Sequence, residues 1–168
     1  MPHIMLVTGG AKSGKSAFAE AQARTHSGQP VYIATAERGD AEMRARIDRH
    51  QLQRGPDWRT IEEPLNLLGA LERAQGNGAV LVDCLTLWLS NLMLAGADWQ
   101  GAVAQLCAAL PMQPDPVILV TNEVGQGIVP ANALAREYCD ASGVMNQALG
   151  AVADSVVLVV CGQSLRIK

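Results

Sequence analysis

One stretch near the start of the chain decides the fold, and it reads His3-Ile4-Met5-Leu6-Val7-Thr8-Gly9-Gly10-Ala11-Lys12-Ser13-Gly14-Lys15-Ser16. Its apolar first half has the length and composition of a buried strand. Its second half, from Gly9 to Ser16, matches the pattern G-x-x-x-x-G-K-S in full, and a segment of helical period follows. The pattern is informative where a strand precedes it and a helix follows it, and both conditions are met here. The stretch therefore predicts a strand, a phosphate-binding loop and a helix in succession.

The chemistry of the loop follows from its residue types. Glycine lets backbone N–H groups turn inward around phosphate oxygens, where a Cβ would obstruct the curve. The start of the following helix adds partial positive charge. We expect Lys15 to be a catalytic residue that reaches the β- and γ-phosphates, and Ser16 to ligate Mg²⁺. A glycine-rich turn that binds nothing is disfavoured by the complete pattern in its proper context. The residues expected to contact a nucleotide are Gly9, Gly10, Ala11, Lys12, Ser13, Gly14, Lys15 and Ser16.

Outside this stretch, short apolar runs alternate with longer segments of helical period. The runs predict strands at His3–Thr8, Val31–Thr35, Ala79–Cys84, Pro116–Thr121 and Ser155–Cys161. The longer segments predict helices at Lys15–Thr25, Ala41–Arg54, Leu65–Gln75, Leu85–Leu94 with Gln100–Leu110, and Ala131–Val152. We expect Arg59–Glu62 to join the sheet or line its edge, and Ser164–Lys168 to fold back as an antiparallel edge strand. The alternation indicates a single α/β domain over residues 1–168, with a mostly parallel sheet flanked by helices.

The composition of the chain indicates which partners and which cellular compartment to expect. The chain has 168 residues, and 13 basic against 16 acidic side chains give a net charge of −3, so neither nucleic acid nor an anionic membrane is an expected partner. Four scattered cysteines indicate reduced thiols of a cytoplasmic protein. The apolar runs are far shorter than the roughly 20 residues of a spanning helix, and the N-terminus lacks the pattern of a signal peptide.

Two carboxylates follow predicted strands. Asp83 ends the apolar run Ala79–Val82, which places it at the carboxyl edge where open α/β sheets bind ligands, and we expect it to hold Mg²⁺ with Ser16. Capping of the next helix is an alternative role and is compatible with the first. Glu123 follows the strand Val117–Thr121 and can orient a hydroxyl or accept its proton. An acidic residue in a turn is an equal alternative for Glu123.

The order of motifs resembles that of the bifunctional adenosylcobinamide kinase/adenosylcobinamide-phosphate guanylyltransferase family of cobalamin biosynthesis. The resemblance runs from end to end. Lys12 departs from the pattern, because relatives commonly have arginine there. The resembling stretches are Leu6–Ser16, Tyr32-Ile33-Ala34-Thr35, Asp40–Ile47 leading to His50, Trp58-Arg59-Thr60-Ile61-Glu62, and Val120-Thr121-Asn122-Glu123-Val124-Gly125-Gln126-Gly127-Ile128-Val129-Pro130.

The resemblance implies two reactions. The family phosphorylates adenosylcobinamide with ATP or GTP and then transfers GMP from GTP to that phosphate, through a guanylylated histidine whose counterpart here is His50. The resemblance also implies a homotrimer with a sheet like that of recombination ATPases. Carried over residue by residue, the nucleotide contacts outside the phosphate loop are Ala34, Thr35, Ala36, Gln51, Leu52, Gln53, Arg54, Glu62 and Asp83.

The residues around His50 allow two interpretations. Met43, Ile47 and His50 share one helical stripe, which is typical of an amphipathic residue at the edge of a core. Arg46 and Arg54, four residues to either side, can flank the imidazole instead. Their positive charge would lower the pKa of His50 and keep the ring neutral and nucleophilic at pH 7. A ring nitrogen can attack phosphorus and then leave, which divides one difficult transfer into two easier ones.

Two other functions remain open from the residues alone. A P-loop small-molecule kinase would use Gly9–Ser16, Asp83 and Glu123 but no nucleophilic histidine. A nucleotide-gated switch or assembly protein would use hydrolysis to change conformation. The short loops that we expect throughout the chain count against the switch. Glu62 and its neighbour Glu63 are equally able to contact a guanine edge or ribose, and Trp58 can stack on a base or simply pack.

Overall fold

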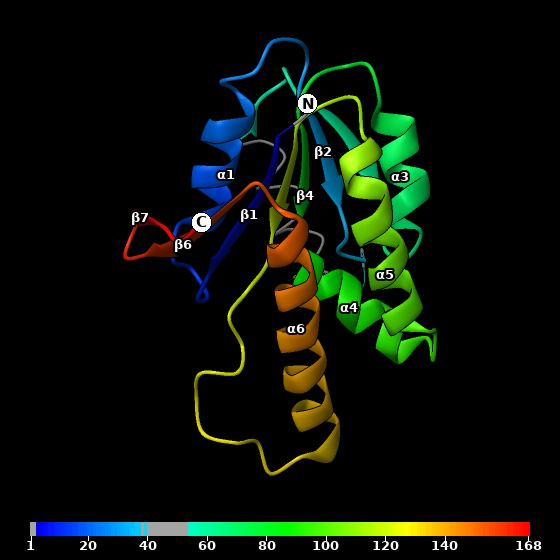
Figure 1. The fold of residues 1–168 in the computed structure, drawn as a ribbon, viewed down its shortest axis with the longest axis vertical. Coiled ribbons are helices and arrows are strands. Elements are labelled where there is room, and N and C mark those ends of the chain that lie inside the picture. Colours follow the sequence, from blue (N-terminus) through cyan, green and yellow to red (C-terminus); the bar gives the residue numbers. More distant parts are fainter. Residues whose placement is uncertain (1–2, 38, 40–53) are drawn as a thin grey trace.

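The computed structural model describes residues 3–37, 39 and 54–168. A seven-stranded sheet forms its centre, in the order β3-β2-β4-β5-β1-β6-β7 (Figure 1). All neighbouring strands are parallel except β6 and β7, which are antiparallel. This confirms the predicted sheet, including the antiparallel edge strand near the end of the chain. The strands are β1 Ile4–Gly9, β2 Val31–Ala34, β3 Arg59–Glu62, β4 Val80–Asp83, β5 Val117–Val120, β6 Ser155–Val160 and β7 Gln163–Arg166.

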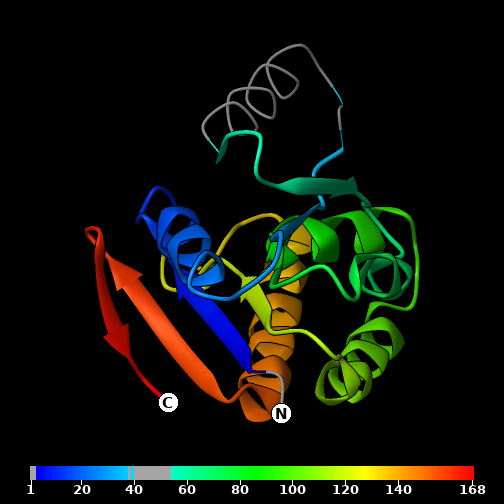
Figure 2. The same ribbon diagram turned by 90° about the horizontal axis from the view of Figure 1, so that it is seen from above.

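Helices cover both faces of the sheet unequally (Figure 2). The helix α1, Lys15–Ala23, packs on β1, β4, β5 and β6 from one side. On the other side lie α3 Leu67–Ala74, α4 Leu85–Leu94, α5 Trp99–Ala109, a short 3-10 turn Leu110–Met112, and α6 Ala133–Val152. Successive side chains of a strand point to opposite faces, so Leu6 joins the larger core and Val7 joins the core beneath α1.

Side-chain caps explain why two helices begin later than the hydrophobic pattern predicts. Asn66 accepts a hydrogen bond from Gly69 N at 3.0 Å, and Asn132 accepts one from Ala135 N at 3.0 Å. Each asparagine satisfies an N–H group that the first turn of a helix leaves without a partner, and so fixes the helix start immediately after it. The helix predicted at Ala41–Arg54 lies outside the described residues, except for Arg54 itself.

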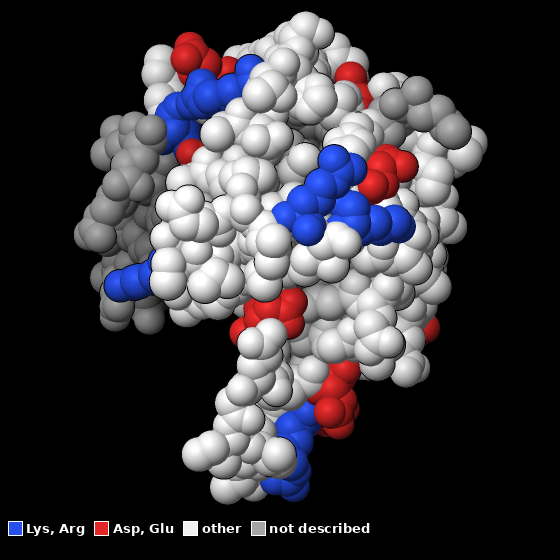
Figure 3. Space-filling view, turned by 60° about the vertical axis from the view of Figure 1, so that its left-hand side comes forward, with Lys and Arg blue, Asp and Glu red and all other residues white. Residues whose placement is uncertain are grey.

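The expectation of short loops is wrong for one segment. Residues 121–132 join β5 to α6 without any helix or strand, and with the first turns of α6 they project beyond the carboxyl edge of the sheet (Figures 1 and 3). We call residues 122–140 the arm. Its loop contains Gly125, Gly127 and Pro130, which favour irregular backbone. Ile128 is 97% exposed and Val129 is 74% exposed, so the apolar side chains of this loop are not ordered by burial in a core.

Among the described residues, none of the helices is both long enough and apolar enough to cross a membrane.

The junction between β3 and α3 separates the roles of two adjacent glutamates. Glu63 accepts hydrogen bonds from Asn66 N at 3.0 Å, from Leu65 N at 3.3 Å and from Arg73 Nη2 at 3.1 Å. Burial alone would raise the pKa of Glu63, but these bonds lower it from its ordinary value. Glu63 therefore holds the start of α3, whereas Glu62 ends β3 at the sheet edge.

We expect Glu63→Gln to lower the free energy of unfolding by about 1 kcal/mol at pH 7, because the charged acceptor is lost. A depressed folded-state pKa contributes stability above the unfolded value, and this contribution disappears as the pH falls through the folded value. Urea denaturation at pH 7 and near pH 3 should therefore show the difference only at the higher pH. Glu72→Gln on the same helix is the control. An equal deficit at both pH values would contradict the assignment.

Candidate functional site

The loop from Gly9 to Ser16 connects β1 to α1, as the sequence predicts. Gly14 is the N-cap of α1 and has φ 98°, a left-handed conformation that favours glycine. The Lys15 side chain is nearly buried and donates a hydrogen bond from Nζ to Gly10 O at 2.9 Å. The ammonium group is therefore held against the loop itself. Ser16 lies half-buried in the first turn of α1.

Strand register brings three predicted site residues into one row. Asp83 pairs with Ala34 of β2, and Ala34 pairs in turn with Glu62 of β3. On its other side Asp83 pairs with Val120, which is the neighbour of Val7 in β1. Parallel strands end at the same edge, so these residues and the phosphate loop all lie at the carboxyl edge of the sheet.

The surroundings of Asp83 are partly buried and contain charges of both signs. Burial raises the pKa of Tyr32 and the Asp83 carboxylate raises it further, while Arg54 opposes them. Burial likewise raises the pKa of Glu20 on α1, with Arg54 opposing and Asp83 adding to the effect. The capping role for Asp83 is not observed, because Cys84 is the N-cap of α4 and makes no side-chain cap bond.

A metal ion at this edge would be held jointly by the protein, phosphate and water. No group of three or more His, Cys, Asp or Glu side chains in the described part of the chain could hold one. Mg²⁺ takes six oxygen ligands and is usually bound through one or two protein groups together with phosphates and water. A hydroxyl from Ser16 and a carboxylate from Asp83 are the oxygen donors that suit such a shared ion.

The Thr35 hydroxyl is bonded to the buried backbone of Cys84 and does not face an open site. The Thr35 side chain is fully buried, and Oγ1 donates to Cys84 O at 2.6 Å while accepting from Cys84 N at 2.9 Å. Ala34 is also buried, and Ala36 is half-exposed. The Thr35 hydroxyl therefore fixes the backbone that follows Asp83, and a direct contact of this hydroxyl with a nucleotide is not supported.

Arg54 is a buried cation whose hydrogen-bonding capacity is incompletely used. It is 4% exposed, its Cζ lies 3.4 Å from the centroid of the Tyr32 ring, and among the described residues neither Nε nor Nη1 has a hydrogen-bond partner. Trp58 packs edge-on against Tyr32, with ring centroids 6.1 Å apart, and Arg24 lies over its ring. Trp58 thus acts as a packing residue here. His50, Gln51, Leu52 and Gln53 lie outside the described residues.

Glu123 lies directly beside the phosphate loop. Its Oε1 accepts a hydrogen bond from Thr8 Oγ1 at 2.5 Å, and its backbone N–H donates to Gly9 O at 3.2 Å. The preceding Asn122 is held by Thr86 Oγ1, which accepts from both its N and its Nδ2. These contacts hold the Glu123 carboxylate beside the phosphate loop.

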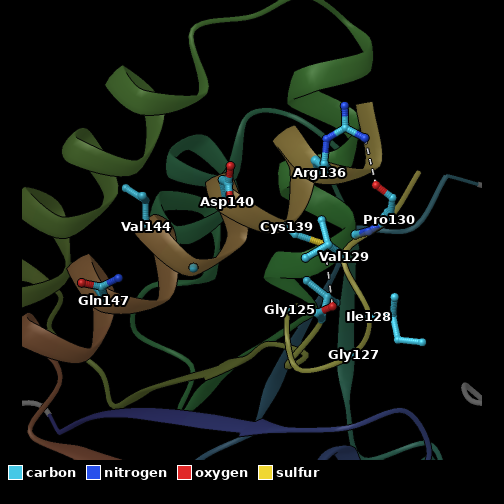
Figure 4. Close-up of a pocket in the computed structure, with 12 residues that line it drawn as sticks. Gly125, Gly127, Ile128, Val129, Pro130, Arg136, Cys139, Asp140, Val144 and Gln147 are labelled. Atoms are coloured by element: carbon cyan, nitrogen blue, oxygen red, sulfur yellow. Dashed lines mark hydrogen bonds between the residues drawn. The ribbon is translucent and has the colours of Figure 1, made fainter. Parts of the chain in front are cut away.

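The arm and the next turns of α6 line an open cavity of about 640 Å³ that the sequence did not indicate (Figure 4). Arg136 closes one end of the loop, donating from Nη1 to Pro130 O at 2.9 Å and to Ala131 O at 2.7 Å. Cys139 Sγ donates to Val124 O at 3.7 Å from the facing side of α6. The cavity follows Glu123 in the chain, and only the glycine-rich composition of the loop could have suggested it.

Comparison with known proteins agrees with this geometry. A family model described as cobinamide kinase / cobinamide phosphate guanyltransferase matches residues 5–167. The chain is 42% identical to the bifunctional adenosylcobalamin biosynthesis protein CobP of Pseudomonas aeruginosa, over 97% of this chain and 96% of that protein. It is 43% identical to the bifunctional protein CobU of Salmonella typhimurium, over 98% of this chain and 99% of that protein.

Solved structures resemble the fold at low sequence identity. The flagellar accessory protein FlaH of Methanocaldococcus jannaschii aligns with a TM-score of 0.54 at 12% identity, covering 100% of this chain and 80% of that one. The P4 protein of bacteriophage phi6, in complex with ADP, aligns with a TM-score of 0.53 at 17% identity, covering 96% of this chain and 52% of that one. These similarities show a shared fold of the P-loop ATPase type.

The buried hydroxyl of Thr35 provides a direct test of the edge geometry. We expect Thr35→Val, which keeps the shape but leaves the Cys84 N–H group unsatisfied, to lower the free energy of unfolding by about 2 kcal/mol in chemical denaturation. Thr35→Ser retains the hydroxyl and should recover most of that loss. Equal destabilisation by both variants would mean that methyl packing, not hydrogen bonding, holds this segment.

Proposed function

The chain belongs to the cobinamide kinase / cobinamide phosphate guanyltransferase family, and we propose that it phosphorylates adenosylcobinamide and then transfers GMP to the product, giving adenosylcobinamide-GDP. The observation that carries the proposal is the family match over residues 5–167 together with a complete phosphate loop at the carboxyl edge. The source of the first phosphoryl group is ATP or GTP, and GTP supplies the GMP.

We assign binding of the triphosphate to the loop Gly9–Ser16. The Lys15 ammonium, which already lies against Gly10 O, can exchange that carbonyl for β- and γ-phosphate oxygens. Ser16 and Asp83 would hold Mg²⁺, which neutralises charge on the phosphates. The Glu20 carboxylate, which interacts with Asp83, adds negative charge that would favour a metal ion there. Ala36 and Glu62, at the same edge, complete the expected nucleotide contacts.

Glu123 is our candidate for the proton acceptor in the kinase step. The aminopropanol hydroxyl oxygen of the substrate attacks the γ-phosphorus, its proton passes to the Glu123 carboxylate, and the bond to the leaving nucleoside diphosphate breaks. The contacts of Glu123 with Thr8 and Gly9 place the carboxylate next to the loop. Thr8 bonds one carboxylate oxygen, which fixes the orientation of the other.

His50 is our candidate for the nucleophile of the second reaction. Its ring nitrogen attacks the α-phosphorus of GTP and pyrophosphate leaves, and the phosphate of the substrate then attacks the same phosphorus and releases the histidine. Arg54, four residues later, supports this assignment, because its buried guanidinium has N–H groups without partners among the described residues. Gln51, Leu52 and Gln53 would contact the same nucleotide. We further propose a homotrimer and a cytoplasmic location.

A covalent adduct distinguishes the two-step enzyme from a simple kinase. After incubation with Mg²⁺ and GTP, intact-protein mass spectrometry should show addition of one GMP that is labile in acid and stable in base. His50→Ala should abolish the adduct while leaving phosphorylation of adenosylcobinamide within about threefold of the wild type. Lys15→Ala should abolish both reactions. Wild-type protein that binds GTP but never carries GMP would identify a monofunctional kinase instead.

The role of Glu123 predicts an effect on one reaction alone. We expect Glu123→Gln to lower kcat of the kinase step by about 100-fold, because the amide cannot accept the proton. The yield and rate of the GMP adduct should remain close to those of the wild type. Thr8→Val, which removes the partner of Glu123 without removing the carboxylate, should have a smaller effect on kcat. Equal loss of phosphorylation and adduct formation in Glu123→Gln would indicate that Glu123 instead maintains the loop.

A further inference from the structure

The antiparallel hairpin of β6 and β7 touches the phosphate loop from outside the nucleotide site. Val160 pairs with Gln163, which leaves Cys161 and Gly162 as a two-residue turn. The backbone N–H of Gly162 donates a hydrogen bond to Ser13 O at 2.8 Å. This bond joins a turn near the end of the chain to the fifth residue of the octapeptide loop.

The turn has a conformation that glycine favours. Cys161 has φ 52° and Gly162 has φ 76°, so both lie in the left-handed region, as in the type I′ turns that match the twist of a hairpin. A cysteine with positive φ is uncommon. A Cβ added at Gly162 would meet no atom within 4 Å, so substitutions there act through backbone preference rather than through a clash.

The loop also approaches the hairpin too closely for side chains to intervene. A Cβ on Gly14 would lie 3.2 Å from Gly162 Cα, and a Cβ on Gly9 would lie 2.4 Å from Val159 O. A Cβ at Gly9 would therefore clash with the hairpin, and a Cβ at Gly14 would crowd it at a residue whose φ of 98° already favours glycine. The backbone of the loop rests on the end of β6 and on the turn.

We propose that the Cys161-Gly162 turn positions the phosphate loop for nucleotide binding. The C=O and N–H groups of a trans peptide point in opposite directions. Because Ser13 O points to Gly162, the N–H group of the same peptide, which belongs to Gly14, points away from the hairpin. The bond therefore fixes one of the N–H groups that phosphate binding requires. Gly162 touches no substrate and is a positioning residue for the proposed nucleotide site, on which this inference rests.

The expected consequence is a change in affinity rather than in chemistry. A loop that is already held in its binding conformation does not lose that freedom when the nucleotide arrives. Loss of the Gly162 bond should therefore weaken the binding of every nucleotide that uses the loop, by about five- to tenfold. At saturating nucleotide, kcat of both reactions should stay within about twofold of the wild type.

Cys161 allows the Gly162 hydrogen bond to be tested by replacing a single backbone amide with an ester. Ligation at this native cysteine joins a thioester of residues 1–160 to a synthetic peptide of residues 161–168, and refolding gives the full chain. Replacing Gly162 by glycolic acid turns its amide into an ester and removes only the donor. The matched control replaces the amide of Ile167 by an ester, because Ile167 N also donates a 2.8 Å bond, to Val156 O, within the hairpin and away from the loop. The all-amide ligation product is the reference.

Calorimetric titration with Mg²⁺ plus ADP, and with Mg²⁺ plus α,β-methylene-GTP, gives the readout. We expect the ester at Gly162 to raise Kd for both nucleotides and the ester at Ile167 to leave Kd within about twofold of the reference. Equal effects of the two esters, or no effect of either, would overturn the inference. If the all-amide protein binds neither nucleotide, the proposed function fails instead, so the two failures are distinguishable.

A substitution series gives an independent check in the intact recombinant protein. Asparagine tolerates left-handed backbone, whereas a β-branched residue strongly disfavours it. Gly162→Asn should therefore retain nucleotide affinity, and Gly162→Val should weaken it in parallel with the ester. Loss of thermal stability in Gly162→Val with unchanged Kd would show that the turn serves only the hairpin, and would overturn the inference.

Discussion

The register of the parallel strands is the constraint on which the rest of the molecule depends. Side chains alternate between faces along each strand, so a shift of one residue would turn Asp83 from the side of α1 to the side of α4. The observed pairing places Asp83 beside Ala34 and, one strand further, Glu62. The same ladder, continued through β5 to β1, determines where the phosphate loop begins. Chemistry at the sheet edge is therefore a consequence of how buried valines, leucines and isoleucines pair.

Much of this arrangement could be predicted from the sequence, because its signals are local. The octapeptide, the buried apolar runs and the carboxylate at the end of one run all depend on residues that adjoin in the chain. The buried bond between Thr35 and Cys84 could not be predicted, since it joins positions that only the sheet brings together. The different roles of Glu62 and Glu63 likewise depend on where α3 turns. The length of the loop at residues 121–132 was missed because an irregular segment has no periodic signal.

The site combines a buried cation with acids that burial makes harder to ionise. Arg54 packs on Tyr32 and counters the effect of Asp83 on the pKa values of Tyr32 and Glu20. A metal ion or a triphosphate bound here would add charge and so change the pKa values of these groups. The long loop of the arm also means that short loops can no longer be used as an argument against a nucleotide-gated switch. The family to which the chain belongs, rather than loop length, is what identifies a biosynthetic transferase.

The central position of β1 has a consequence for how the protein is made. β1 precedes the other described strands in the sequence, yet its two neighbours in the sheet are β5 and β6, which come after β2, β3 and β4. Contacts between residues so distant in sequence form late and slow the folding of a domain. The nascent chain therefore exposes an apolar strand and an unsupported phosphate loop until β6 has been synthesised. We therefore expect the nucleotide site to assemble late in folding, after β1 has paired with both β5 and β6.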